Sequence, residues 1–110
     1  MVYNKEAISA EFERGKLMLN SGDYGKAIEL FSKIIDTVAL AIEEDKDAKV
    51  TWDTALNNRG LAKCKLAYST GDKALYESGM EDYRTTVNTF SEGERHCNQE
   101  GKFSFFRQMN

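Results

Sequence analysis

The sequence predicts an all-α protein made of antiparallel helical hairpins, and three observations carry that prediction. The 110-residue chain contains no proline, so no residue forbids long helices, and β-rich folds usually place proline in their turns. Apolar residues recur at steps of three and four along most of the chain, which is the spacing of one helix face. Two Gly-Asp turns, at residues 22–23 and 71–72, separate the periodic stretches. The pattern is therefore helix, tight turn, helix, and it occurs twice.

The first predicted helix covers about residues 4–20, where several apolar side chains are separated by four or five residues. They are Ala7, Ile8, Phe12, Leu17 and Leu19. We expect Gly22 to end this helix, because glycine adopts the left-handed conformation of a C-cap at little steric cost. Asp23 can then accept hydrogen bonds from the free N–H groups that open the next helix.

The second predicted helix begins after Asp23 and runs to about Glu44. Its apolar residues follow the i, i+3, i+4, i+7 rule of one helix face: Ala27, Ile28, Phe31, Ile34, Ile35, Val38 and Ile42. The polar stretch 43–49 is expected to be a connection or a continuing, solvent-exposed helix. It lacks the glycine and the terminal glutamate of a calcium-binding EF-hand loop.

Two further helices are predicted, over about residues 50–69 and 73–90. The apolar members of the third helix are Trp52, Leu56, Leu61, Cys64, Leu66 and Tyr68. In the fourth helix one face carries Tyr76, Met80, Tyr83, Val87 and Phe90. Residues 91–110 are expected to form a C-terminal helical segment, in which Ser91 and Glu94 can make a capping box.

Composition and charge exclude several classes of protein. The chain carries 15 basic and 18 acidic residues with the two signs interleaved, so it has no basic stripe to bind the phosphates of nucleic acid. No apolar run approaches the ~18 residues that a membrane helix needs, and the charged N-terminus lacks the apolar stretch of a secretory signal. The expected location is cytoplasmic, with Cys64 and Cys97 as free thiols.

No group of residues in the sequence has the pattern of a catalytic or metal-binding site. The sequence has neither a glycine-rich phosphate loop nor a nucleophile with a base, so an enzyme is not expected. His96 lies beside Cys97, but a metal site needs three or four ligands and nothing nearby completes the set. No cofactor is therefore expected either.

The two halves of the predicted helical region repeat one another. Each half has Arg-Gly in its first helix, then a Gly-Asp turn, then an aromatic, a small and an aromatic residue at spacings of three and four. These last residues are Tyr24, Ala27 and Phe31 in the first half and Tyr76, Gly79 and Tyr83 in the second. The chain thus contains an internal repeat of a helix–turn–helix unit.

This repeat resembles the tetratricopeptide repeat (TPR) family. Units of that family carry a large apolar residue, a Leu-Gly pair and a tyrosine on the first helix, and Ala-x3-Phe on the second. The matching residues are Gly15, Tyr24, Ala27 and Phe31 in the first unit and Leu56, Gly60, Tyr76 and Tyr83 in the second, with Gly79 replacing the small alanine. Antiparallel helices approach closely where their side chains are small, so we expect Gly15 to face Ala27. Tyr24 and Phe31 would then fill the adjacent groove.

The spacing of the units departs from the family pattern. Gly15 and Gly60 are 45 residues apart, against a family period of ~34. Gly60 and Gly79 are 19 residues apart, where Gly15 and Ala27 are 12 apart. Both excesses are close to whole numbers of helical turns. We therefore expect lengthened helices whose faces are not rotated.

The expected architecture is one domain over residues 1–110, a TPR-like α-solenoid of two repeats. The repeats cover about residues 5–45 and 50–90, and a C-terminal segment covers 91–110. Repeat arrays generally need three or more units to cover their cores. Two units therefore need help from the C-terminal segment, from a partner chain or from both.

The resemblance implies that a concave face, lined by the first helix of each unit, binds a peptide or partner protein. The positions that match this face are Phe12, Lys16, Leu19 and Asn20 in the first unit and Asn57, Asn58, Leu61, Cys64 and Lys65 in the second. Such a mixed apolar and basic groove suits a peptide with some acidic character. Alternatively, the C-terminal helix of the same chain fills this groove.

Asn58 matches an asparagine with which some TPR domains grip the carboxylate end of chaperone peptides. That clamp also needs a lysine and an asparagine on the preceding unit and a lysine and an arginine on a later one. Phe12 and Lys16 stand at the first two positions, and there is no third unit. Binding of chaperone C-termini is therefore not expected, and Asn58 should instead make a hydrogen bond between helices.

The sequence thus favours a protein–protein interaction module, an adaptor or scaffold that binds through its concave face. The alternative is a self-associating structural protein that forms a homo-oligomer. Its possible assembly surface is the tail, whose apolar residues are Phe103, Phe105, Phe106 and Met109. These residues are too apolar for a disordered tail, so they should fold back onto the helices or bury against another chain.

Overall fold

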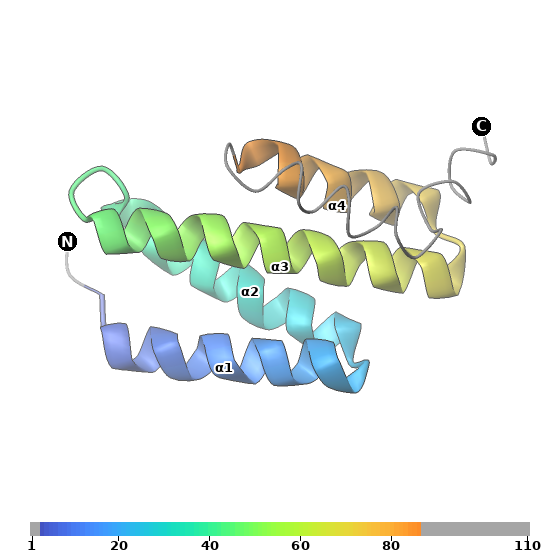
Figure 1. The fold of residues 1–110 in the computed structure, drawn as a ribbon, viewed down its shortest axis with the longest axis horizontal. Coiled ribbons are helices and arrows are strands. Elements are labelled where there is room, and N and C mark those ends of the chain that lie inside the picture. Colours follow the sequence, from blue (N-terminus) through green and yellow to red (C-terminus); the bar gives the residue numbers. More distant parts are fainter. Residues whose placement is uncertain (1–2, 87–110) are drawn as a thin grey trace.

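A computed structural model of the chain describes residues 3–86. Its helices are α1 (Lys5–Ser21), α2 (Tyr24–Val38), the short 3-10 helix η1 (Ala39–Ala41), α3 (Lys46–Thr70) and α4 (Lys73–Thr85). α1 and α2 form one antiparallel hairpin, α3 and α4 form a second, and α2 packs against α3 to join them (Figure 1). The predicted all-α fold of helical hairpins is confirmed. The predicted C-terminal segment lies outside the described residues.

The same turn closes both hairpins. Gly22 and Gly71 have φ angles of 90° and 73°, in the left-handed region that glycine adopts at little cost. The aspartate that follows each glycine caps the next helix. Asp23 and Asp72 each accept a hydrogen bond from the backbone N–H three residues further on, at 3.2 and 3.0 Å. The turn chemistry predicted from the sequence is therefore present twice.

The connection between the hairpins differs from the prediction. α2 ends at Val38, where the chain tightens into η1, and does not continue to Glu44. α3 begins at Lys46 and not at Val50, because Asp45 is extended and its carboxylate accepts a backbone N–H of the first turn at 2.9 Å. The polar stretch 43–49 is thus part connection and part helix.

The end of α4 also differs from the prediction. The helix stops at Thr85, because Thr86 has extended backbone angles, with φ −97° and ψ 107°. The prediction of a helix to Phe90 was therefore wrong for the last described residue. The positions beyond Thr86 that were assigned to the same helix face lie outside the described residues.

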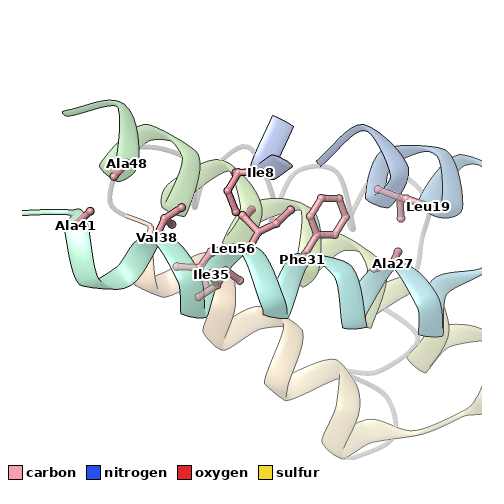
Figure 2. Close-up of a cluster of buried hydrophobic side chains, with 12 residues drawn as sticks. Ile8, Leu19, Ala27, Phe31, Ile35, Val38, Ala41, Ala48 and Leu56 are labelled. Carbon is pink, nitrogen blue, oxygen red and sulfur yellow. The ribbon is translucent and has the colours of Figure 1, made fainter. Parts of the chain in front are cut away.

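The first core cluster fills the space between α1, α2 and α3, and Figure 2 shows its members converging from these helices. Its buried residues are Ile8, Leu19, Ala27, Phe31, Ile34, Ile35, Val38, Ala41, Ala48, Ala55, Leu56 and Ala62. Phe31 is fully buried, and its ring meets that of Phe12 edge to face, with 5.5 Å between the ring centroids. The large side chains of α2 thus carry most of this core, as its regular apolar stripe predicts.

α3 is packed on two sides, which explains why its apolar pattern is diffuse. Three alanines that recur every seven residues belong to the first core cluster: Ala48, Ala55 and Ala62. Other residues of α3 form a second core cluster with α4, whose members are Cys64, Ala67, Tyr76, Met80 and Tyr83. Leu61 contacts both clusters. A central helix of this kind needs small residues, because neighbours approach it from both sides.

Gly60 and Gly79 lie where the backbones of α3 and α4 touch. A Cβ atom added to either glycine would lie 2.8 Å from the carbonyl oxygen of the other. The predicted contact of two small residues is therefore present in the second hairpin. In the first hairpin, a Cβ on Gly15 would lie 2.8 Å from Cζ of Phe31, so this glycine makes room for the ring that was expected to fill the adjacent groove.

The seven extra residues of the second hairpin are divided between its two helices. Gly60 lies eleven residues before its turn glycine, whereas Gly15 lies seven residues before its own. On the returning helix, Gly79 follows the capping aspartate by seven residues, whereas Ala27 follows it by four. Each helix therefore gains about one turn beyond the crossing, which keeps the inward face of both helices unchanged.

Candidate functional site

An open pocket of about 270 Å³ lies between the N-terminal halves of α1 and α3. Its lining residues are Tyr3, Lys5, Ile8, Ser9, Phe12, Glu13, Asp47, Val50, Thr51 and Thr54. α1 and α3 are the first helices of the two hairpins and lie on the same side of α2 (Figure 1). The pocket therefore lies between the two helices from which the sequence predicted a binding groove.

Only one of the predicted groove residues on α1 lines this pocket. Phe12 does so, and its ring packs against the first core cluster. Lys16 is exposed one turn further along α1, and its ammonium is 3.7 Å from the carboxylate of Glu13. Leu19 is buried in the first core cluster, so a partner cannot reach its side chain. Asn20 is exposed near the end of the helix.

The predicted groove residues on α3 lie beyond the pocket. Leu61 is half-buried between the two core clusters, and Lys65 is half-buried one turn further on. Asn58 donates from Nδ2 to the carbonyl oxygen of Thr54 at 3.0 Å, so its hydrogen bond lies within its own helix and does not join two helices as expected. Oδ1 of Asn57 is buried, and no donor in the described part of the chain reaches it.

Three apolar residues of the pocket were missed by the sequence analysis: Tyr3, Ile8 and Val50. Val50 is 64% exposed, although it lies on the central helix of the structure. The signal that could have revealed it is the capping aspartate, Asp45. A helix that begins at Lys46 carries Val50 in its second turn, where it lies across from the first half of α1.

Ion pairs of Lys5 link the start of α1 to the start of α3 at the edge of the pocket. Its ammonium lies 3.5 Å from the carboxylate of Asp45 and 3.6 Å from that of Asp47. The charge of Asp45 raises the pKa of Lys5. The pKa of Asp45 is lowered, first by the hydrogen bond from the Asp47 N–H and also by Lys5. The pKa of Tyr3 is raised, mainly by burial and then by the charge of Asp45.

The pocket is more acidic than the predicted groove. Its lining contains one cation, Lys5, and two anions, Glu13 and Asp47. The carboxylate-bearing side chains of Glu13 and Asp47 are 70% and 81% exposed. The prediction of a basic groove rested on Lys16 and Lys65, and neither lines the pocket. The pocket is therefore a different surface from the mixed apolar and basic groove that the sequence analysis described.

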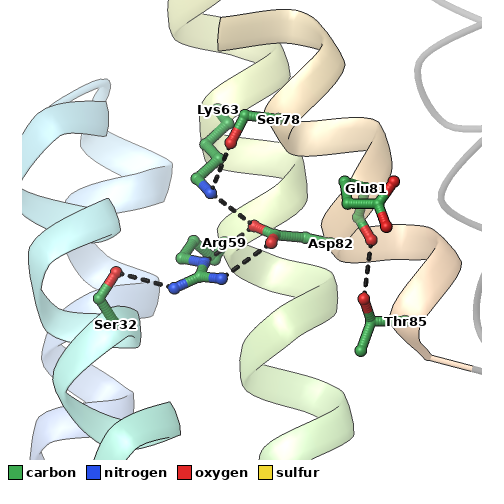
Figure 3. Close-up of polar contacts among 7 residues, drawn as sticks. All are labelled: Ser32, Arg59, Lys63, Ser78, Glu81, Asp82 and Thr85. Atoms are coloured by element: carbon green, nitrogen blue, oxygen red, sulfur yellow. Dashed lines mark hydrogen bonds and ion pairs between the residues drawn. The ribbon is translucent and has the colours of Figure 1, made fainter.

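Apart from the pocket, a cluster of polar side chains joins α2, α3 and α4, and Figure 3 shows its contacts. Arg59 donates from Nε and Nη2 to the two carboxylate oxygens of Asp82, each at 2.8 Å, and from Nη1 to Ser32 at 3.1 Å. The ammonium of Lys63 is 3.1 Å from Asp82 and 2.9 Å from the hydroxyl of Ser78. These contacts link three helices, and none of the five residues lines the pocket.

The contacts of this polar cluster are directed inward, to its own members. Asp82 is only 5% exposed, and each cation contacts both the carboxylate and a hydroxyl group. The sequence analysis missed the cluster. Arg59 and Lys63 are four residues apart on one helix face, but their carboxylate lies on another helix, 23 residues beyond Arg59. We interpret the cluster as a structural tie between helices.

Comparison of the chain with protein-family models, with curated proteins and with solved structures gave no match. Over residues 3–86, no three or more His, Cys, Asp or Glu side chains are grouped so that they could hold a metal ion. No helix in the same range has the length and apolar character to cross a membrane.

The predicted sites in the C-terminal part of the sequence lie outside the described residues. The possible assembly surface consists of Phe103, Phe105, Phe106 and Met109; His96 and Cys97, at which no metal site is expected, also lie there. Their assignment stays a prediction from sequence. The candidate functional site of the described residues is the pocket between α1 and α3.

Proposed function

We propose that this chain is a protein–protein interaction module, and that a segment of a partner protein inserts one bulky apolar side chain into the pocket between α1 and α3. The exposure of Val50 is the observation that carries this proposal. Its side chain is 64% exposed beside Ile8 and Phe12, in a concave part of the surface. Apolar side chains gathered in an open concavity are characteristic of interaction sites.

The size of the pocket favours a side-chain anchor over a whole small-molecule ligand. Sites for such ligands typically enclose about 300–1,000 Å³. This pocket, at about 270 Å³, falls below that range and is open on one side. The hydroxyl-bearing residues Ser9 and Thr51 also line it, and they offer hydrogen-bonding groups to the backbone of an inserted segment.

The proposal includes the interpretation of the two hairpins as divergent TPR-like units. Three features support it: the repeated Gly-Asp turn, the glycines where paired helices touch, and the placement of the pocket on the first helices of both hairpins. In the TPR family, which the sequence resembles, the first helices of the units form the binding face. The same face carries a partly apolar pocket that is lined by residues of both hairpins.

Val50→Glu is expected to weaken peptide binding at least tenfold while leaving the fold intact. The side chain is exposed, and glutamate in an early turn of a helix is compatible with the helix dipole. A charge beside the apolar anchor should reduce the enrichment of bound peptides at least tenfold, which corresponds to about 1.4 kcal/mol. The measurement is phage display of random heptapeptides on the full chain, with far-UV circular dichroism as the check on folding.

Leu17→Glu is the matched control. Leu17 is 61% exposed on α1 and does not line the pocket, so the same change of charge should leave peptide selection unaltered. The wild-type chain and the control should enrich sequences that share one bulky apolar residue. The proposal is wrong if the wild-type chain enriches no such sequences, or if the Val50→Glu variant enriches the same ones.

A further inference from the structure

We infer that the partner segment carries a lysine or arginine next to its apolar anchor. This inference rests on the proposed function, because it names the chemistry of the partner that enters the same pocket. The inference depends on the balance of charge around the opening of the pocket. An interaction surface selects its partner by complementary charge, which also raises the rate of encounter.

Carboxylates outnumber cations at the opening. Glu13 and Asp47 line the pocket and are largely exposed, while Lys5 is the one cation in the lining. The charge of Lys5 is already shared between Asp47 and Asp45, at 3.6 and 3.5 Å. A partner cation placed at the opening would therefore meet carboxylates that Lys5 alone does not neutralise.

The neighbouring cations do not reverse this balance. On α1, the ammonium of Lys16 is 3.7 Å from the carboxylate of Glu13. Lys49 on α3 is 3.0 Å from Asp53 and lies over the ring of Trp52, so it is engaged on its own helix. Adding Lys16 and Asp45 to the lining residues still leaves one carboxylate in excess, and the whole chain has a net charge of −3. An acidic partner would place its charge beside exposed carboxylates.

The expected preference is modest in size. Exposed ion pairs contribute little, because solvent screens them, and the start of α3 adds a partial positive charge near Asp47. We expect about threefold tighter binding for a basic flank than for an acidic flank at low salt. This ratio should shrink towards one at high salt, because the Debye length falls to about 3 Å at 1 M.

The experiment uses three synthetic seven-residue probes and the full chain. One probe has phenylalanine between two lysines, the second has phenylalanine between two glutamates, and the third has alanine between two lysines. Binding is followed by the NMR shifts of the Ile8 and Val50 methyl groups, which line the pocket. The lysine–phenylalanine probe should bind most tightly, and the alanine probe should produce no shifts at these methyl groups.

A charge-reversal variant tests whether the preference arises in the pocket. Glu13→Lys should invert the order of the two phenylalanine probes. Asp36→Lys is the matched control: it makes the same change in net charge at an exposed position on α2 that does not line the pocket. This control should keep the wild-type order. An unchanged order in Glu13→Lys would overturn the inference, because the preference would then follow the net charge of the chain.

The outcomes separate the inference from the proposed function. If both phenylalanine probes bind equally well and the Val50→Glu variant binds neither, the inferred basic flank is wrong but the pocket remains the binding site. No methyl shift with any probe would overturn both. Shifts of the same methyl groups on raising the protein concentration without probe would assign the pocket to a second copy of this chain, and the inferred partner would be wrong.

Discussion

Asp82→Ala is expected to lower the free energy of unfolding by about 3 kcal/mol, because it leaves two poorly solvated cations without their shared carboxylate. The side chains of Arg59 and Lys63 are only 19% and 13% exposed, and both contact Asp82. Breaking a buried pair by removing one partner is costly because the remaining charge is neither hydrated nor paired. Urea denaturation followed by circular dichroism at neutral pH measures the effect.

Two comparisons isolate this cause. Glu77→Ala removes a 65% exposed carboxylate from the same helix, 3.9 Å from Lys73, and should change stability by less than about 0.5 kcal/mol. Replacing the whole ion cluster with apolar residues (Arg59→Met, Lys63→Met and Asp82→Leu together) should restore most of the stability, since no unpaired charge remains. If Asp82→Ala costs no more than Glu77→Ala, the cluster does not hold the helices together.

Gly60→Ala is expected to destabilise the chain by about 2 kcal/mol, although alanine is the better helix former by about 1 kcal/mol. The new Cβ would lie 2.8 Å from the carbonyl oxygen of Gly79, so two helix backbones would have to move apart. Backbone atoms cannot swing aside as the end of a side chain can. The reciprocal change at Gly79 meets the carbonyl oxygen of Gly60 at the same distance and should have a similar effect.

Gly25→Ala is the matched control for this contact. Gly25 is exposed within α2, and a Cβ there would have no neighbour within 4 Å. The same substitution should therefore raise stability, by up to about 1 kcal/mol, through helix propensity alone. If urea denaturation shows a loss of stability for Gly60→Ala and a gain for Gly25→Ala, the close helix crossing excludes a side chain at position 60. A gain in stability at both positions would contradict the crossing.

The features that the sequence predicted well are those that depend on neighbouring residues. Gly22 and Asp23 define a turn by their own conformational preferences, and the same pair recurs at Gly71. The apolar stripe of α2 faces one side of the structure, so its period of three and four residues is plain. Turns and apolar stripes of this kind can be predicted from the sequence without knowing which helices are neighbours in space.

The features that were missed depend on which helices meet. The buried alanines of α3 escaped notice because a helix packed on two sides has no single apolar stripe. The bond between Arg59 and Asp82 joins residues 23 apart, and many lysine, arginine and carboxylate pairs in the sequence have comparable spacings. The close approach of the Phe31 ring to Gly15 was missed as well, because sequence spacing suggested Ala27 as the neighbour of this glycine.

The pocket lies on the two helices from which the sequence analysis expected a groove, but it shares only Phe12 with the residues named for that groove. The resemblance to TPR units pointed to the first helix of each hairpin, and α1 and α3 do line the pocket. Its position follows from the start of α3, which was placed too late in the sequence because the polar stretch 43–49 was interpreted as a connection. Because α3 begins at Lys46, Val50 lies within the helix and opposite α1. The pocket is therefore closer to the N-terminal ends of both helices than the predicted groove is.

The most direct test of binding through this pocket is an isotope-filtered NOE experiment on the full chain with the lysine-flanked phenylalanine probe. The account predicts contacts from the phenylalanine ring of the probe to the methyl groups of both Ile8 and Val50, which belong to α1 and α3. Contacts from the ring to Leu17 or Leu40, which are exposed away from the pocket, would contradict it.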